Sequence, residues 1–183
     1  MQQTHPNAKS FSSDLQTKLG QIFNIDRQCE FIAGKGSYAC RSFIGNGNFE
    51  DICTGLWCKT LDPFSSNCVL ALPAEGTSCG SSKLCNGYSC EFDSSAPRGD
   101  SDSCIFGDGP GIIWNGQACS DLTSKEPYQC YSESIRKSCC GSCNKIKSSN
   151  PDCEYGDKSL DCVGVVTRGL CSLYAKECCK SCA

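Results

Sequence analysis

Residues 153–183 read CEYGDKSLDCVGVVTRGLCSLYAKECCKSCA and place six cysteines in 31 residues. The stretch opens with Cys, any residue, an aromatic residue, Gly and Asp, and it closes with Cys-Cys-x-Ser-Cys. Residues 104–143 have the same frame, since they open with CIFGD and close with CCGSC. The spacings between the first four cysteines are 14, 10 and 8 residues at 104–143 and 8, 8 and 6 residues at 153–183. The sequence therefore predicts two repeats of one six-cysteine module with loops of variable length.

The disulfide connectivity of these two modules stays open at this point, because six cysteines permit fifteen pairings. Before each closing Cys-Cys lies a segment with several helix-forming residues, YSESIRKS at 131–138 and SLYAKE at 172–177. We expect one or two helical turns in each segment. Tyr174 and Lys176 are also the aromatic and basic pair that a toxin-like module would expose, but a short helix with a solvent-exposed face explains them more simply.

The whole chain is rich in cysteine, with 20 cysteines among 183 residues. The count is even, so ten disulfides are possible in a chain that matures in an oxidising compartment. Large apolar residues are too few for one large core, and small modules need crosslinks to be stable. The expected fold is a string of small disulfide-rich modules with little regular secondary structure. The predicted parts are a linker or the end of a missing upstream region at 1–26, a first module at 27–92, a connector at 93–103, a second module at 104–143, a connector at 144–152 and a third module at 153–183.

The first module carries a resemblance in three stretches: LGQIFNIDRQCEF at 19–31, EDICTGLWCK at 50–59 and LPAEGTSCGSSKLCNGYSCE at 72–91. They resemble, in order and spacing, the disintegrin-like domain of ADAMTS-type secreted zinc metalloproteases. One departure is Leu84, where that family commonly has Trp. The resemblance implies a domain that packs against an upstream protease domain and offers surface to a protein substrate. It also implies four bridges, namely Cys29–Cys58, Cys40–Cys68, Cys53–Cys85 and Cys79–Cys90.

The second and third modules are similar to the PLAC module found at the C-terminus of many such proteases and to ShK-like six-cysteine toxins. Residues 153–183 resemble PLAC throughout, and residues 104–143 match mainly at their two ends. The implied arrangement is a disintegrin-like domain followed directly by cysteine modules. That order is unlike most vertebrate members and closer to short invertebrate relatives.

Catalysis by the mechanism of that family needs a helix with two zinc-binding histidines, a third histidine and a glutamate base. The chain has one histidine, His5, followed by Pro6. We therefore expect no enzymatic activity, no metal and no other cofactor on this chain, with zinc confined to a missing catalytic domain. The CxxC pairs at 140–143 and 179–182 are a possible redox signal. Because both lie in the same repeated ending, structural crosslinks are the preferred interpretation.

Charge and hydropathy exclude two classes of partner. The 17 basic and 20 acidic residues form no basic cluster, so nucleic acid is not expected as a partner. The longest wholly apolar run, 68–72, is much too short to cross a membrane. The polar N-terminus lacks a secretory signal, although the cysteines require an oxidising compartment. We expect a piece of a longer protein that is secreted into the extracellular matrix and meets a matrix protein as substrate.

Two places are candidate binding sites. The segment after Cys68 holds Val69, Leu70 and Leu72, which we predict to be an apolar exosite for a protein substrate; the alternative is that they form the small core of the module. Trp57 is expected to pack against the bridges as an apolar plug.

The second candidate is the tripeptide Arg98, Gly99 and Asp100 in the connector. It suggests an alternative function, a standalone adhesion or matrix protein that binds integrin. We expect this connector to be long and mobile, which would make integrin binding weak.

Overall fold

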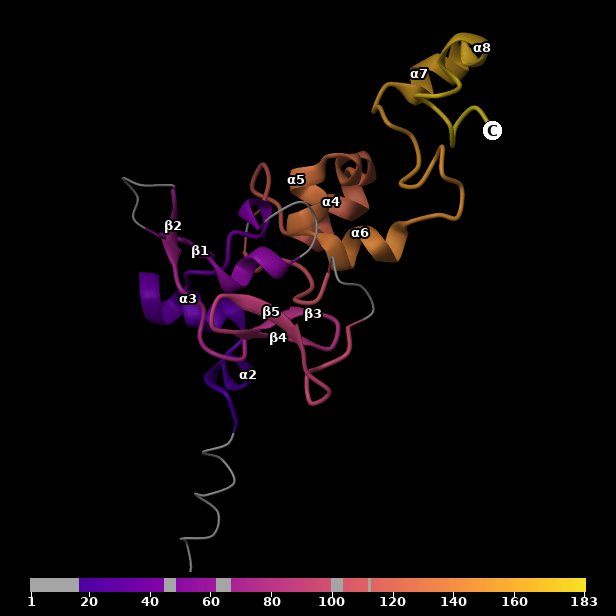
Figure 1. Cartoon of the computed structure of the whole chain (residues 1–183). Helices are drawn as coiled ribbons and strands as arrows, with labels where there is room; N and C mark the ends of the chain where they lie inside the picture. The colour runs from indigo at the N-terminus through magenta and orange to yellow at the C-terminus, as the bar shows by residue number, and fades with distance from the viewer. Residues whose placement is uncertain (1–16, 45–48, 62–66, 100–103, 112) are drawn as a thin grey trace, which may run out of the picture. The chain divides into compact units, whose positions relative to one another are not determined.

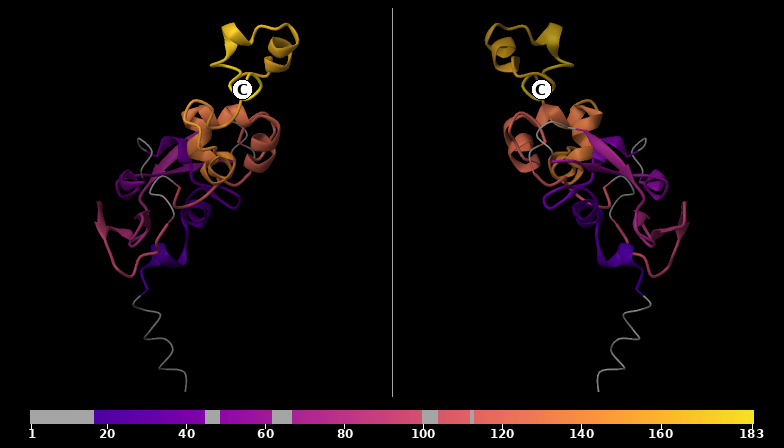
Figure 2. Two further views of the ribbon diagram at one scale, coloured as in Figure 1. Left: turned by 90° about the vertical axis from the view of Figure 1, so that its right-hand side faces the viewer. Right: turned by 90° about the vertical axis from the view of Figure 1, so that its left-hand side faces the viewer.

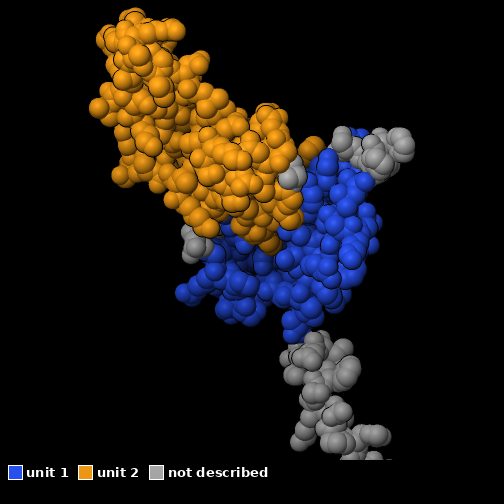
Figure 3. Space-filling view, turned by 180° about the vertical axis from the view of Figure 1, so that it is seen from behind, with its two compact units in different colours: residues 1–40, 44–105 blue, residues 41–43, 106–183 orange. Residues whose placement is uncertain are grey.

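The computed structural model describes residues 17–44, 49–61, 67–99, 104–111 and 113–183 (Figure 1). The chain divides into two compact units (Figure 3). Unit 1 consists of residues 1–40 and 44–105, and unit 2 consists of residues 41–43 and 106–183. All helices and strands of the described residues are short, and every cysteine is disulfide-bonded. The expected fold class, small disulfide-rich modules with little regular secondary structure, is confirmed.

The described residues of unit 1 form two short α-helices and two small sheets. The helices are α2 (Leu19–Ile22) and α3 (Ile25–Ala33). Strands β1 (Leu56–Lys59) and β2 (Cys68–Ala71) form an antiparallel ribbon. The second sheet has the order β3-β4-β5, and its strands are β3 (Ser78–Gly80), β4 (Lys83–Asn86) and β5 (Ser89–Phe92). A 3₁₀ turn, η2 (Glu50–Cys53), supplies buried Ile52.

Helix α3 is set by its ends and by its buried face. The side chain of Asn24 caps the N-terminus by accepting a hydrogen bond from Arg27 N, and Gly34, with φ of 99°, ends the helix. Ile25 and Cys29 lie four residues apart, so both side chains point into the module, where they are fully buried. The other buried apolar residues of unit 1 include Ile52, Leu56, Leu84 and bridge cysteines.

Residues 19–26 are not linker, contrary to the expected boundary at residue 27. They form α2 and the start of α3, and Gly20 N donates to Glu75 O. A Cβ on Gly20 would lie 2.1 Å from Thr77 N, so only glycine fits this close approach. The buried amide of Gln28 then joins α3 to the same segment, because it donates to Thr77 Oγ1 and accepts from Ala74 N.

Four bridges crosslink unit 1: Cys29–Cys58, Cys40–Cys68, Cys53–Cys85 and Cys79–Cys90. These are the four pairs that the resemblance implies. The last bridge joins β3 to β5, and β5 forms a hairpin with β4 in which Asn86 pairs with Ser89 across a two-residue loop. Gly87 begins that loop with a φ of 58°, a conformation that favours glycine.

Unit 2 is helical. Its elements are η1 (Arg41–Phe43), α4 (Cys119–Lys125), η3 (Pro127–Tyr131), α5 (Glu133–Ser138), α6 (Cys140–Ile146), α7 (Cys162–Thr167) and α8 (Cys171–Tyr174). Helices α5 and α8 confirm the helical turns expected before each Cys-Cys. In Figure 1 and in both views of Figure 2, α7 and α8 are the last two helices of the chain and are drawn in yellow. No helix among the described residues is long and apolar enough to span a membrane.

The two six-cysteine repeats share one connectivity. In the second module Cys119 pairs with Cys139 and Cys130 with Cys143. The third module has three bridges, Cys153–Cys179, Cys162–Cys178 and Cys171–Cys182. Cys104 and Cys140 are also disulfide-bonded, and by elimination they form the tenth bridge. Both repeats therefore join their first cysteine to the fifth, the second to the fourth and the third to the sixth, a single choice among the fifteen.

The Asp of the opening motif ties the two ends of each repeat together. Asp108 Oδ1 accepts from Ser142 N at 2.9 Å, and Asp108 Oδ2 accepts from the Ser142 hydroxyl. Asp157 accepts from Lys180 N, Ser181 N and the Ser181 hydroxyl in the equivalent arrangement. The shared Gly-Asp and Ser-Cys positions of the two sequences are thus explained by one carboxylate that caps the closing turn.

A residue of the following segment, Tyr155, completes the core of the second module. Tyr155 is buried in the cluster that contains Leu122, Ile135 and four bridge cysteines. Its ring packs edge-to-face on Tyr131 with ring centroids 5.2 Å apart, and the Tyr131 hydroxyl donates to Gly156 O at 2.8 Å. The start of the third module is therefore part of the packing of the second.

Candidate functional site

The ribbon β1–β2 places the predicted exosite residues at the surface. Backbone hydrogen bonds from Cys40 N to Trp57 O and from Lys59 N to Tyr38 O cover one edge of β1, so β2 is the outer strand. Within the described residues β2 has β1 as its single strand partner. Such an edge strand leaves backbone groups unpaired along its outer side, and the side chains of β2 are half-buried or exposed.

Two apolar side chains of this strand and one that directly follows it form what we name the β2 ridge: Val69, Leu70 and Leu72. They are 39%, 58% and 60% exposed. Residues that pair directly across an antiparallel ribbon share a face, so Val69 lies on the face of buried Cys58 and Leu70 lies on the face of half-buried Trp57. The alternative interpretation, in which Leu70 and Leu72 form the core of the module, disagrees with this exposure.

Leu70 is anchored although it is exposed. A Cβ on Gly55 would lie 2.6 Å from Leu70 Cδ1 and 4.0 Å from Trp57 Nε1, so the leucine lies across the glycine beside the indole. Trp57 is half-buried on this outer face, whereas Leu56 fills the core beside it. The expectation of Trp57 as the apolar plug is therefore wrong, because strand alternation turns Leu56 inward and Trp57 outward.

The connector after β5 is held to the module over residues 93–99, so the expectation of a mobile connector is wrong there. Asp93 N donates to Ser82 O, Ser82 N donates to Pro97 O, and Ala96 is buried. The Ser81 hydroxyl lies 3.2 Å from Gly99 O and 3.3 Å from Gly99 N. Arg98 is exposed between these contacts, and Asp100 lies outside the described residues.

Asp93 fixes the first turn of this connector. Its carboxylate accepts from the hydroxyl and the backbone N of Ser95 and lies 3.8 Å from Lys18 Nζ. These two hydrogen bonds, with a smaller contribution from Lys18, hold the pKa of Asp93 below its ordinary value. The turn therefore keeps its negative charge at neutral and mildly acidic pH.

Cysteine chemistry is restricted to crosslinks. The sulfurs of Cys53, Cys79 and Cys85 lie within 4.8 Å of one another, but all three are bridged and offer no thiolate to a metal. The CxxC pairs are not dithiols either, because Cys143 pairs with Cys130 and Cys182 pairs with Cys171. His5 lies outside the described residues.

The segment that carries the β2 ridge is similar to a known protein family. Residues 19–91 match the model of ADAMTS cysteine-rich domain 2. This match begins at Leu19, where the structure also begins the folded part of the first module. The model is described as a cysteine-rich domain, so the designation of residues 27–92 as disintegrin-like stays a prediction. The PLAC and ShK-like similarities of residues 104–143 and 153–183 also stay predictions.

Known relatives agree with this match. The chain is 32% identical over 96 residues to "A disintegrin and metalloproteinase with thrombospondin motifs 19" of Mus musculus and 32% identical over 97 residues to the Homo sapiens protein of that name. These alignments cover 51% and 52% of the chain. It is 29% identical over 150 residues, 77% of the chain, to "A disintegrin and metalloproteinase with thrombospondin motifs 6" of Homo sapiens. The chain spans 8% of the length of the first two relatives and 12% of the third. The first module is thus similar to an ancillary, non-catalytic region of ADAMTS proteases.

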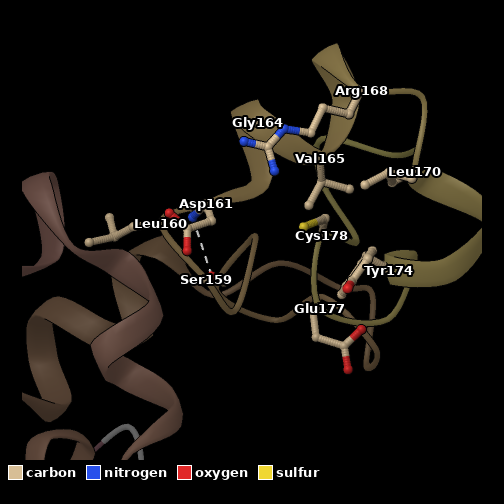
Figure 4. A pocket seen from close by; sticks show the side chains of 10 residues that line it. All are labelled: Ser159, Leu160, Asp161, Gly164, Val165, Arg168, Leu170, Tyr174, Glu177 and Cys178. Carbon is tan, nitrogen blue, oxygen red and sulfur yellow. Dashed lines mark hydrogen bonds between the residues drawn. The ribbon is translucent and has the colours of Figure 1, made fainter.

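Sequence reasoning missed one feature, an open pocket in the third module (Figure 4). Its volume is about 570 Å³, within the range of ligand-binding pockets. Its residues come from the loop before α7, from α7 and from the segment around α8. The one available signal was the loop-length difference between the two repeats.

Proposed function

We propose that this chain is a non-catalytic ancillary region of an ADAMTS-like extracellular metalloprotease and that the β2 ridge contacts its protein substrate. The observation that carries the proposal is the exposure of Val69, Leu70 and Leu72 on and directly after a strand of a ribbon that two bridges hold in place. The ridge belongs to the segment that matches the ADAMTS cysteine-rich domain.

The ridge binds by burying apolar surface. A buried Leu side chain contributes about 1.5–3 kcal/mol relative to an exposed one. The crosslinks hold the ribbon before binding, because Cys58 is tied to Cys29 and Cys68 to Cys40. Little backbone entropy is then lost on binding, so a small apolar ridge suffices for a useful contact.

The remaining partners lie outside this chain. The catalytic zinc and its histidines belong to a protease domain upstream, and the substrate is a protein of the extracellular matrix. The sequence encoded immediately 5′ of Met1 tests this part. A helix with the zinc-protease motif there supports the proposal, whereas a signal peptide directly before Met1 contradicts it.

Replacing Leu70 with Ser in the complete enzyme tests the ridge. Because Leu70 is 58% exposed, the module should stay folded while cleavage of a protein substrate falls by roughly tenfold, the equivalent of one lost apolar contact. Cleavage of a short peptide should not change, since a short peptide does not reach beyond the catalytic cleft.

Tyr88→Ser is the matched control, because Tyr88 is 68% exposed in the β4–β5 loop of the other sheet. It should leave both activities unchanged. Equal losses of protein and peptide cleavage in Leu70→Ser would contradict the exosite and show a folding defect instead.

The second candidate function is adhesion through Arg98, Gly99 and Asp100. The attachment of residues 93–99 to the Ser81–Ser82 turn favours it, since a held connector loses less entropy on binding an integrin. Cells plated on the purified chain test this function. Cation-dependent attachment that Asp100→Glu abolishes would support it, and attachment unchanged by that substitution would exclude it.

A further inference from the structure

The pocket of the third module lies among apolar and charged side chains. Val165, Leu170 and Tyr174 form its apolar wall, with Cys178 beside them (Figure 4). Arg168 lies at one end of the pocket and Glu177 at the other (Figure 4). No function so far described uses this pocket.

The same positions form the core of the second module. Counted from the shared cysteines, Val165 corresponds to Leu122, since each lies three residues after the second cysteine. Tyr174 corresponds to Ile135 in the same way, four residues before the closing Cys-Cys. Leu122 is 0% exposed and Ile135 is 5% exposed, whereas Tyr174 is 44% exposed. One site is therefore closed in the second module and open in the third.

The backbone frames of the two repeats agree at this site. Gly109 N donates to Ser138 O at 2.7 Å in the second module, and Lys158 N donates to Glu177 O at 2.7 Å in the third. Each donor directly follows the Asp that caps the closing turn, and each acceptor directly precedes the Cys-Cys. The open pocket therefore does not result from a different disulfide connectivity or from a different backbone arrangement at this site.

A side chain from a longer loop closes the site in the second module. Ile113 packs against the buried cluster of Leu122 and Ile135, and its Cδ1 would lie 3.3 Å from a Cβ on Gly109. The loop that carries Ile113 has 14 residues between its cysteines, and the equivalent loop of the third module has 8. The shorter loop offers Leu160, which stays 66% exposed.

The charged side chains around the pocket have no ion-pair partner among the residues that the structure describes. This holds for Arg168, Asp161 and Glu177, which are all exposed. An incoming loop can therefore be oriented by opposite charges, with an acidic group at the Arg168 end and a basic group at the Glu177 end.

We propose that the third module is a receptor for a loop of another protein that inserts an aliphatic side chain between Arg168 and Glu177, as Ile113 does within the second module. The inserted side chain replaces water at Val165, Leu170 and Tyr174, which supplies the affinity. The two charged ends of the pocket select the direction of the loop.

The chain's own loop provides the probe. Peptide DGPGIIWNGQ, residues 108–117 extended by one Lys, should bind the ¹⁵N-labelled full chain at millimolar concentration. We expect saturable amide shifts at Gly164, Val165 and Glu177. A peptide with serine in place of both isoleucines should bind at least about tenfold more weakly. Shifts that are absent, or that spread evenly over the chain, would overturn the proposal.

Two variants of α7 separate the pocket from general surface binding. Val165→Ser should weaken binding of the probe about fivefold or more, because Val165 lines the pocket. Val163→Ser is the matched control: Val163 lies on the same helix, is 75% exposed and is outside the pocket, so it should change nothing. Unchanged amide shifts at Asp157 and Ser181 would show that both variants keep the fold.

The direction of binding is tested by exchanging the terminal Asp and Lys of the probe. Arg168→Ala should weaken the original peptide more than the exchanged one. Equal affinities of the Val165→Ser and Val163→Ser variants for the probe would contradict binding in the pocket. Equal affinities of the two peptides for the unchanged chain would contradict the assigned direction of the loop.

Discussion

The second and third modules have the same crosslinks and the same carboxylate cap, yet one has a closed core and the other an open one. Leu122 and Ile135 are buried in the second module, where Ile113 and Tyr155 pack around them. At the equivalent place the third module has a pocket. Comparing the two modules separates the effect of the disulfides from the effect of core packing, because the disulfide connectivity is the same in both modules and the packing of the core differs.

The third module therefore depends more on its crosslinks than the second module does. Most large apolar residues of the third module are exposed, among them Leu160, Val163 and Leu173. A module with so little core depends on restriction of its unfolded state, which is the main effect of a disulfide. The second module has a second source of stability in its buried cluster.

The largest effect is expected from removing one bridge in each repeat. Replacing Cys162 and Cys178 together with Ala should unfold the third module, because such a loss costs about 2–5 kcal/mol and little core remains. Replacing Cys119 and Cys139 removes the equivalent bridge of the second module, which should keep α4 and α5. The two bridges close loops of similar separation, 16 and 20 residues, so the entropic costs are close.

Hydrogen exchange of backbone amides measures this difference. Protection should vanish in α7 and α8 of the first double variant and persist in α4 of the second. If both modules lose protection alike, the buried cluster of the second module contributes little and the comparison fails.

A smaller effect is expected from shortening the two equivalent apolar residues. Leu122→Ala should destabilise the second module by about 2–4 kcal/mol, because Leu122 is fully buried. Val165→Ala should cost the third module less than about 1 kcal/mol, since Val165 lines an open pocket. Denaturant unfolding followed by NMR resolves the modules, and Val163→Ala serves as the exposed control. Equal costs at the two positions would show that the pocket is closed in solution.

The smallest effect is expected from acidification. Burial raises the pKa of Asp157, but hydrogen bonds from Ser181 and Lys180 outweigh this and hold the pKa below the ordinary 3.8. A lowered pKa adds stability above pH 3.8 that is lost as the pH falls through the lower value. The third module should therefore weaken below about pH 4, which ¹⁵N spectra at stepwise lower pH would record.

Asp157→Asn is the control for this acid dependence. The amide cannot lose a proton, so it should remove this part of the pH dependence and cost about 1 kcal/mol at neutral pH through the lost charge-assisted hydrogen bonds. An unchanged acid response in Asp157→Asn would assign the dependence to other carboxylates.

Several features could be predicted from the sequence because they depend on cysteine spacing or local patterns. The two repeats, the helical turns before each Cys-Cys and the fold class follow from regular spacing within a few dozen residues. The expected start at residue 27 was wrong because Gly20 and Gln28 contact residues 74–77, about 50 positions away in the chain. Such non-local contacts leave no periodic signal.

The candidate sites likewise combine features that the local sequence predicts with features that depend on non-local contacts. Val69, Leu70 and Leu72 were found as an apolar run, but whether they lie in a core or on a ridge depends on how the β1–β2 ribbon packs against the rest of the module. The mobile connector was expected from its Ser, Asp and Pro content, yet the Ser81 hydroxyl and the Ser82 backbone bind backbone groups of the connector, and composition does not reveal such contacts.

The sequence by itself determined the number of crosslinks, the blocks in which they lie and the repeat of one module frame, since cysteine spacing and the Gly-Asp and Ser-Cys positions are local. Tertiary structure alone decided which of the fifteen pairings each repeat has and which repeat is closed. The physical reason is that pairing and closure depend on how loops of 14 and 8 residues fold back, and therefore on whether a side chain such as Ile113 reaches the site.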